Sequence, residues 1–379
     1  MKIVIAPDSF KGSLSALEVG NAIRDGIVKV GHDIDTIVVP MADGGEGIVQ
    51  SLIDATGGDI IKTTVHDPLF RTIDSFYGIL GDGKTAVIEM AAASGLPLLK
   101  PEERDPLKTT SYGTGELIKD AMDKGCTSII LGLGGSATND GGIGMAQALG
   151  VCFLDENGNS VHVGGHELSR IRTIDVSGID DRVSNVKFIA ACDVDNPLCG
   201  QNGASNVYGR QKGASDSDVE TLDKGLVHFA HIVKNSLGLD IKDLPGTGAA
   251  GGLGYAVMLF LNARLERGID IVTRLLKLDE IICGADLVIT GEGKMDAQTA
   301  FGKTPYGVAQ IARKMNIPVV ALAGSLGPGY STLYNSGFDC IYSIIDRPML
   351  LEEALANTKE LLENSAENVV RLWNAVKIK

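Results

Sequence analysis

The sequence predicts an α/β protein of two domains, in which strands and helices alternate along the chain. Three observations support this fold class. The chain has 379 residues, which is more than a single hydrophobic core usually serves. Short apolar runs alternate with amphipathic helical patterns near both ends of the chain. The 48 glycines cluster between apolar runs, which is typical of many tight loops rather than of disorder.

The first strand and helix are defined by sharp local signals. The apolar run Ile3–Ile5 predicts a buried strand that ends at Pro7, because proline cannot continue a central ladder. Ser15 and Glu18 have the spacing of a helix capping box, and the helical pattern runs from there to about Val30. A second strand is expected at Thr36–Val39, followed by a glycine-rich loop and a helix ending near residues 57–58.

The middle of the chain has a different pattern. Residues 72–80 and 85–90 predict an antiparallel hairpin around a Gly-Asp-Gly turn. Further elements are expected in this order: a helix at about 113–124, a strand at 128–131, a glycine-rich run at 132–144 that opens a helix, and a strand at 186–191. The last hundred residues return to strand–helix alternation, with strands at 286–290, 318–323 and 340–345.

These patterns predict how the two domains are built from the chain. Residues 1–65 and 285–379 are expected to form one discontinuous α/β domain, because strand–helix alternation marks both ends. Residues 66–284 would be an inserted mixed α/β domain. The active site is expected in the cleft between the domains, where ligand sites are common.

Composition excludes several classes of partner. The formal charge is −14 and no stripe of lysine and arginine is present, which argues against nucleic acid. No apolar run is long enough for a membrane span. Pro7 and Asp8 interrupt any signal-peptide pattern, and the six scattered cysteines lack metal-binding spacing. We therefore expect a cytoplasmic enzyme with a small-molecule substrate; the oligomeric state stays open.

Three apparent motifs are not expected to be functional. Residues 78–85 match a phosphate-binding loop by letter, but a strand follows them where that loop needs a helix. Residues 246–251 match a dinucleotide fingerprint without a preceding strand. His228 and His231 lie on an amphipathic helix without acidic or cysteine partners, which favours a solvated face over a metal site.

Polar side chains gather after the predicted strands. Four groups combine acidic residues with neighbouring glycines or lysines: Asp8 with Ser9 and Lys11, Asp43 with Glu46, Asp193 with Asp195, and Glu292 with Lys294 and Asp296. Open α/β sheets bind ligands beyond the carboxyl ends of their strands. Carboxylates there can hold Mg²⁺ or accept a hydroxyl proton, so these groups predict chemistry on a phosphorylated, metal-bound substrate.

The glycine-rich run at residues 134–142 predicts an anion site. Small residues and hydroxyl groups precede a helix there, and backbone N–H groups at a helix start bind phosphate. A tight strand–helix turn is the structural alternative. The expected nucleotide-binding residues of this run are Gly134, Gly135, Ser136, Thr138, Asn139 and Gly141.

These same motifs, in this order, resemble the bacterial glycerate kinase family. The stretches that carry the resemblance are 6–14, 40–47, 110–116, 134–142, 192–198 and 291–296, and it covers essentially the whole chain. The resemblance implies ATP-dependent phosphorylation of D-glycerate with Mg²⁺. It also implies one flavodoxin-like and one restriction-endonuclease-like domain, without settling which is which, and it favours 2-phosphoglycerate as the product.

Roles for the candidate residues follow as a hypothesis. Asp8 or Asp193 would accept the hydroxyl proton, and Lys11 would neutralise phosphate charge. The remaining assignments are Asp43, Asp193 and Asp296 for Mg²⁺, and Ser9, Arg71 and Lys294 for the substrate, with Arg71 or Lys294 on its carboxylate.

Three alternatives remain open. The enzyme could form 3-phosphoglycerate instead. A Mg²⁺-dependent phosphatase or sugar-acid dehydratase would also use acidic strand ends and a phosphate loop. A non-catalytic ligand-binding regulator would bind glycerate without turnover.

Overall fold

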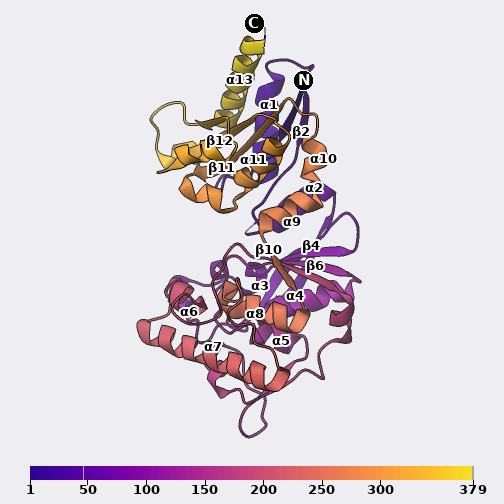
Figure 1. Ribbon diagram of the computed structural model, residues 1–379, viewed down its shortest axis with the longest axis vertical. Coiled ribbons are helices and arrows are strands. Elements are labelled where there is room, and N and C mark those ends of the chain that lie inside the picture. The colour runs from indigo at the N-terminus through magenta and orange to yellow at the C-terminus, as the bar shows by residue number, and fades with distance from the viewer. Residues whose placement is uncertain (46, 378–379) are drawn as a thin grey trace. The chain divides into compact units, whose positions relative to one another are not determined.

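The computed structural model describes residues 1–45 and 47–377, which divide into two compact units (Figure 1). The terminal unit comprises residues 1–43, 50–56 and 269–379, and the central unit comprises residues 44–49 and 57–268. Glu46, which the sequence paired with Asp43, lies outside the described residues.

The terminal unit combines parallel strands with helices. Its strands are β1 (Lys2–Ile5), β2 (Asp35–Val38), β11 (Leu287–Met295), β12 (Val319–Leu326) and β13 (Cys340–Ser343). The helices that lie mostly or wholly in it are α1 (Ala16–Val28), α2 (Ile48–Thr56), α9 (Gly268–Leu275), α10 (Leu278–Ile282), α11 (Thr304–Lys314), α12 (Leu351–Ala356) and α13 (Thr358–Lys377).

The sheet of the terminal unit has the strand order β13-β12-β11-β1-β2, and all its pairs are parallel. Numbered along the chain within the unit, this is the 2-1-3-4-5 order of flavodoxin-like folds. The order reverses between β1 and β11, where Ile3 pairs with Leu287 and Ile5 with Ile289. Ligands of open α/β sheets bind at such a switch point, so the topology marks the ends of β1 and β11 as a site.

Local sequence explains how α1 covers this sheet. The predicted capping box is present: the Ser15 hydroxyl accepts from the Glu18 amide, and the Glu18 carboxylate accepts from the Ser15 amide at 2.8 Å. Figure 1 shows α1 beside α13, so segments from both ends of the chain pack together. A side chain at Gly26 would collide with the backbone carbonyl of Glu363, so this glycine permits the close approach of the two helices.

The central unit contains a larger, mixed sheet. Its strands are β3 (Asp59–His66), β4 (Thr72–Ile79), β5 (Thr85–Glu89), β6 (Ser128–Gly132), β7 (Cys152–Leu154), β8 (Thr173–Asp175), β9 (Lys187–Ala191) and β10 (Arg264–Glu266). Its helices are α3 (Ala91–Ser94), α4 (Tyr112–Asp123), α5 (Ile143–Ala148), α6 (Ala204–Tyr208), α7 (Asp216–Leu237) and α8 (Ala249–Leu261).

The large sheet of this unit has the order β10-β9-β6-β5-β4-β3. Strands β3, β4 and β5 form an antiparallel meander that includes the predicted hairpin, and the other pairs are parallel. Strand β3 was not predicted. Residues 59–65 belong to the central unit, because β3 pairs with β4 along its whole length, whereas the expected boundary at residue 65 put them in the terminal domain. Residues 269–284 belong to the terminal unit, whereas the expected boundary at residue 285 put them in the inserted domain.

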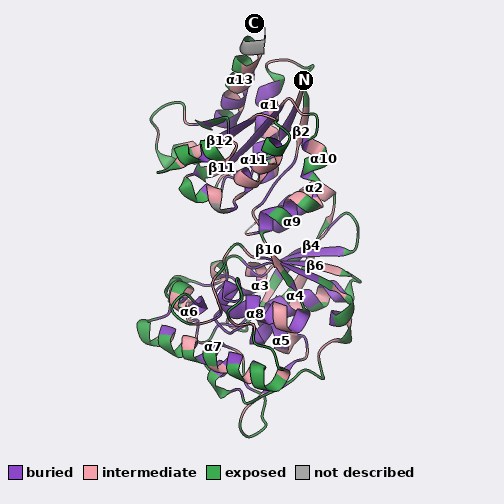
Figure 2. Ribbon diagram, viewed as in Figure 1, coloured by how far each residue is buried: buried purple, intermediate pink, exposed green. Residues whose placement is uncertain are grey.

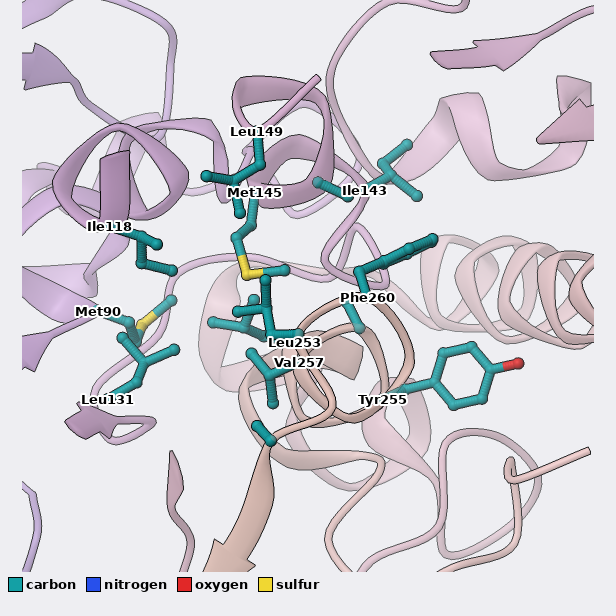
Figure 3. Packing of buried hydrophobic residues seen from close by; sticks show 14 of the residues in the cluster. Met90, Ile118, Leu131, Ile143, Met145, Leu149, Leu253, Tyr255, Val257 and Phe260 are labelled. Carbon is teal, nitrogen blue, oxygen red and sulfur yellow. The ribbon is translucent and has the colours of Figure 1, made fainter. Parts of the chain in front are cut away.

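The core of the central unit lies between this sheet and its helices. Figure 3 shows Met90 and Leu131 beside Ile118 of α4, with Met145 of α5 and Leu253 of α8 packed near them. All five side chains are buried. Helix α7 is amphipathic, with one buried stripe and an exposed outer face (Figure 2). The hydrophobic core thus fixes the strand ends and loops that carry the polar residues described below.

The rejected motifs have the expected structures. The turn before Thr85 leads into strand β5. The segment at Ala250–Gly252 has left-handed backbone angles before the regular part of α8 begins, and no strand precedes it. His228 Nε2 donates to the backbone carbonyl of Ile171 at 2.7 Å, and His231 is exposed.

Candidate active site

A cavity of about 380 Å³ lies at the switch point of the terminal unit. Carboxylates and lysines line its polar part: Asp8, Asp43, Glu292, Lys11, Lys294 and Lys303, together with Ser9. Ile344, Ile345, Leu351 and Leu355 form an apolar wall. The structure therefore brings together five of the predicted site residues, Asp8, Ser9, Lys11, Asp43 and Lys294, which lie in the segments after β1 and β2 and near the end of β11.

Asp8 is held in place by the strand ends and by the start of α11. Its backbone amide donates to the carbonyl of Gly291 at 2.8 Å, which ties the turn after β1 to β11. The Thr304 hydroxyl donates to Asp8 Oδ2 at 2.7 Å, and the Ser9 amide donates to Oδ1 at 2.6 Å. Thr304 was not predicted, since it lies almost 300 positions away in the sequence. These contacts fix the direction of the carboxyl group.

The surroundings of Asp8 favour its protonated form. The residue is 9% exposed, and burial raises the pKa of its carboxyl group, as do the neighbouring charges of Asp43 and Glu292. The hydrogen bonds from Thr304 and Ser9 oppose this shift only partly, and the pKa rises to about 7. A carboxylate with this pKa can accept a proton near neutral pH and release it again.

Glu292 lies within strand β11 instead of the loop that the sequence suggested. We expected the strand to end at Thr290, since glycines follow, but parallel pairing with β12 continues to Met295. Glu292 accepts from the Thr299 hydroxyl at 2.6 Å and from Lys303 Nζ at 3.1 Å. Burial raises the pKa of Glu292 despite these two partners. Lys303 is a further cavity residue that the sequence analysis did not single out.

Asp296 and Lys294 form a pair at the end of β11. Lys294 Nζ lies 3.4 Å from Asp296 Oδ2, and Asp296 also caps the short helix at Ala297–Phe301 by accepting from the Gln298 amide at 2.9 Å. Although burial opposes it, these partners lower the pKa of Asp296. Asp296 is not among the residues that line the cavity, whereas Lys294 is.

The central unit has its own cavity of about 380 Å³, at the carboxyl ends of β6 and β9. Backbone segments 44–45 and 134–136 line it, together with Asp193, Tyr208, Gln211 and Lys212. Asp193 Oδ1 accepts from the Gly268 amide at 3.1 Å. Of the predicted nucleotide-binding residues, Gly134, Gly135 and Ser136 reach this cavity.

The second half of the glycine-rich run has an internal role. Asp140 is fully buried and accepts from the Ser111 amide at 2.8 Å and from the Gly142 amide at 3.0 Å. This carboxylate therefore occupies the amides at the start of α5 that we expected to bind an anion. Thr138, Asn139 and Gly141 are buried beside it and do not line the cavity. The structural alternative, a tight turn, describes this part of the run.

Lys212 is the main residue that sequence reasoning missed in this cavity. It is 2% exposed, and its ammonium group donates to Ser136 Oγ at 2.8 Å and to the Thr138 carbonyl at 2.7 Å. Burial lowers its pKa to about 7. No motif or spacing marks this lysine, because only the tertiary fold buries it.

Arg71 is not among the residues that line either cavity. Its Nε donates to Asp67 at 2.6 Å and its Nη1 donates to Glu103 at 2.7 Å. The guanidinium group is thus already paired with two carboxylates, and Asp67 also supports the turn between β3 and β4 by accepting from the Leu69 and Arg71 amides.

The described residues contain no group of three or more histidine, cysteine, aspartate or glutamate side chains arranged to hold a metal ion. Asp43 lines the cavity of the terminal unit, and Asp193 lines that of the central unit. Mg²⁺ is commonly bound by one or two carboxylates plus substrate phosphates, and single carboxylates of this kind are present.

Comparison with known proteins identifies the family. The model of the "Glycerate kinase family" matches residues 3–374. The chain belongs to the glycerate kinase family. It is 52% identical to the glycerate kinase of Haemophilus influenzae, with 98% of each chain covered, and 50% identical to the glycerate 2-kinase of Escherichia coli, with 97% of each covered.

A solved structure of the same family supports the fold. The crystal structure of a protein described as glycerate kinase 2 from Salmonella typhimurium LT2 covers 100% of both chains, with 50% identity and a TM-score of 0.93. The α/β fold class and the assignment to a kinase family are confirmed. The restriction-endonuclease-like description of one domain stays a prediction. None of the helices in the described ranges is long and apolar enough to cross a lipid bilayer.

Proposed function

We propose that this glycerate kinase transfers the terminal phosphoryl group of ATP to the 2-hydroxyl of D-glycerate. Full-length similarity to glycerate kinases, including one named glycerate 2-kinase, supports the reaction and favours the 2-position. The observation that carries the proposal is the polar part of the terminal-unit cavity, where a buried carboxyl group with a raised pKa lies among lysines. A small hydroxy acid needs both: a proton acceptor for its hydroxyl and cations for its carboxylate.

Asp8 is the residue that accepts the hydroxyl proton. Its carboxyl group is oriented by Thr304 and Ser9, and its pKa of about 7 suits a base that works near neutral pH. Asp193 was the alternative base, but it is exposed, so its surroundings offer no comparable burial. Proton acceptance by Asp8 makes the substrate oxygen a better nucleophile toward phosphorus.

The lysines of the same cavity supply positive charge. Lys294 is the candidate partner of the glycerate carboxylate, in preference to Arg71, which is already paired with Asp67 and Glu103. Lys11 is exposed beside Asp8 and would neutralise charge on the transferred phosphoryl group. Phosphoryl transfer depends mainly on such positioning and charge neutralisation.

The central-unit cavity is the candidate site for the phosphates of ATP. Gly134 and Gly135 present backbone without side chains, and Ser136 adds a hydroxyl group. Asp43 and Asp193 are the candidate carboxylates for Mg²⁺, which when bound would neutralise phosphate charge. Each of these carboxylates offers oxygen donors of the kind that a hard cation prefers.

A coupled assay for ADP release with D-glycerate tests the reaction. A Mg²⁺-dependent phosphatase or dehydratase, or a regulator, would release no ADP. NMR of the product distinguishes 2-phosphoglycerate from 3-phosphoglycerate. Asp8→Asn should lower kcat by at least a hundredfold, consistent with loss of a positioned base. Asp25→Asn is the matched control, since Asp25 is a partly exposed aspartate of α1 whose ion-pair contacts with Arg24 and Lys359 are long, at 3.8 and 4.0 Å.

Retention of near-wild-type turnover by Asp8→Asn would contradict the role of Asp8. Absence of glycerate-dependent ADP release by the wild type would contradict the proposed function itself.

A further inference from the structure

The central unit buries a lysine charge that no carboxylate in the described part of the chain neutralises by direct contact. Lys212 lies in a short helical turn at Arg210–Lys212 and is 2% exposed. Lysines are almost never fully buried unless they are paired. Its two hydrogen-bond partners, Ser136 Oγ and the Thr138 carbonyl, are both neutral. The fold therefore accepts a desolvated cation, which is costly unless a counter-charge arrives from elsewhere.

The charge of Asp140 partly offsets the effect of burial on the pKa of Lys212, and it acts through space without a hydrogen bond to the ammonium group. The carboxylate of Asp140 is already held by donors from Ser111 and Gly142. Asp140 does not line the cavity, whereas the acidic residue Asp193 does. Its Oδ1 accepts a hydrogen bond from the Gly268 amide. Neither carboxylate forms an ion pair with Lys212.

The position of Lys212 lets a ligand supply the missing charge. The lysine lines the cavity together with Ser136 and the exposed glycines at 134 and 135. Ser136 and Thr138 account for two of the three N–H donors of the ammonium group. Apolar residues such as Leu96, Leu133 and Ala249 also line this cavity. Charge interactions are stronger in such surroundings than in water.

We propose that Lys212 binds phosphate oxygens of the nucleotide in the central-unit cavity, with Ser136 and the backbone at Gly134–Gly135 as neighbouring donors. The inference rests on the proposed function, because it identifies the phosphate donor as the ligand of this cavity. It adds a residue outside every recognised motif of the chain. The anion completes an ion pair that the folded chain leaves without its negative partner.

A purely structural role for Lys212 predicts different behaviour. In that case the ammonium group would only fasten the Ser136–Thr138 segment, and its loss would lower stability without a specific effect on phosphate binding. In the proposed role, an anion that binds to Lys212 stabilises the charged ammonium form. Binding near pH 7 should then draw a proton from solution, because burial leaves the amine only partly charged before the ligand arrives.

Isothermal titration with ADP and with pyrophosphate separates the two roles. The comparison uses the wild type, Lys212→Met, and Lys224→Met as a matched control on the exposed face of α7, where Lys224 pairs with Glu220. We expect Lys212→Met to weaken both ligands at least tenfold and Lys224→Met to leave both unchanged. Titration in two buffers of different ionisation enthalpy should show proton uptake by the wild type at pH 7, and its loss in Lys212→Met.

Several outcomes would overturn the inference. These are unchanged ADP affinity in Lys212→Met, a loss confined to ADP with pyrophosphate unaffected, and equal proton uptake in both proteins. If Lys212→Met does not fold, the ADP and pyrophosphate affinities of Lys212→Gln, together with proton uptake by the wild type, test the inference in the same way. The proposed function fails separately: the wild type would then bind ADP with proton uptake but release no ADP from ATP in the presence of D-glycerate.

Discussion

Replacing Asp8 by asparagine should make the protein more stable at alkaline pH while removing its activity. Asp8 is buried, and its pKa rises from the usual 3.8 to about 7 because burial and the charge of Asp43 disfavour the carboxylate. A carboxyl group whose pKa is higher in the folded protein stabilises the fold fully at pH values below its pKa in the unfolded chain. That contribution is lost as pH rises through the folded pKa. Asparagine stays neutral throughout and avoids this loss.

The size of the effect follows from the shift. A difference of about three pKa units corresponds to roughly 4 kcal/mol at most, at about 1.4 kcal/mol per unit. About a third of this stabilisation is already lost at pH 5, so the wild type should lose roughly 3 kcal/mol of stability between pH 5 and pH 8.5. The introduced amide cannot accept from both Thr304 and Ser9 as a carboxylate does, which costs about 1–2 kcal/mol at every pH.

The measurement is thermal unfolding of Asp8→Asn and the wild type across this pH range. We expect the difference in Tm, variant minus wild type, to increase by roughly 5–10 °C from pH 5 to pH 8.5, since about 1 kcal/mol shifts Tm by 2–4 °C in units of this size. Asp25→Asn should show no such trend. A Tm difference that is the same at both pH values would refute the argument that Asp8 is an unusually protonated carboxyl group.

Three further substitutions test the assigned contacts. Lys303→Met should raise KM for glycerate and lower Tm, because Glu292 would lose the cation that offsets its buried charge; equal KM in variant and wild type would contradict a place for Lys303 in the site. Asp140→Ala should destabilise the central unit by about 3 kcal/mol or more, since several buried donors lose their acceptor, and a Tm within 2 °C of the wild type would argue against this role. Arg71→Ala should leave KM for glycerate unchanged within twofold in steady-state kinetics, because Arg71 is paired elsewhere; a tenfold increase would restore it as a substrate anchor.

Local signals in the sequence were sufficient for much of the fold. The capping box of Ser15 and Glu18 begins α1 as predicted, because both partners of the motif lie within one turn. The predicted hairpin of β4 and β5 is also confirmed, because its two strands are close in the sequence and are joined by a short turn. The end of β11 was predicted too early, at Thr290. Pairing with the neighbouring strand β12 extends it through two glycines, and that pairing is set by the tertiary fold.

The candidate site shows where sequence reasoning ends. Asp8 and Asp140 both follow a strand in a glycine-containing loop; Asp8 was a predicted site residue, and Asp140 lies in the run that was expected to bind an anion. The chain supplies Asp140 with donors from α4 and from its own loop, so that carboxylate is satisfied internally. Asp8 instead lies among other carboxylates on a cavity wall, and its pKa rises. Which of the two is available to a ligand depends on distant donors, and these are fixed only when the chain has folded.

Lys212 also depends on tertiary structure for its properties, so no local signal in the sequence marks it. On an extended chain it is an ordinary lysine between a glutamine and a glycine. In the folded chain it is nearly completely buried, and both hydrogen-bond partners of its ammonium group are neutral. A fold retains such an uncompensated charge at a cost to its own stability. Lys212→Met should therefore unfold at a temperature no lower than the wild type without ligand, and should gain less stability than the wild type when ADP is added. A Tm that falls by several degrees without ligand, with an undiminished gain from ADP, would show that Lys212 stabilises the loop and does not bind the nucleotide.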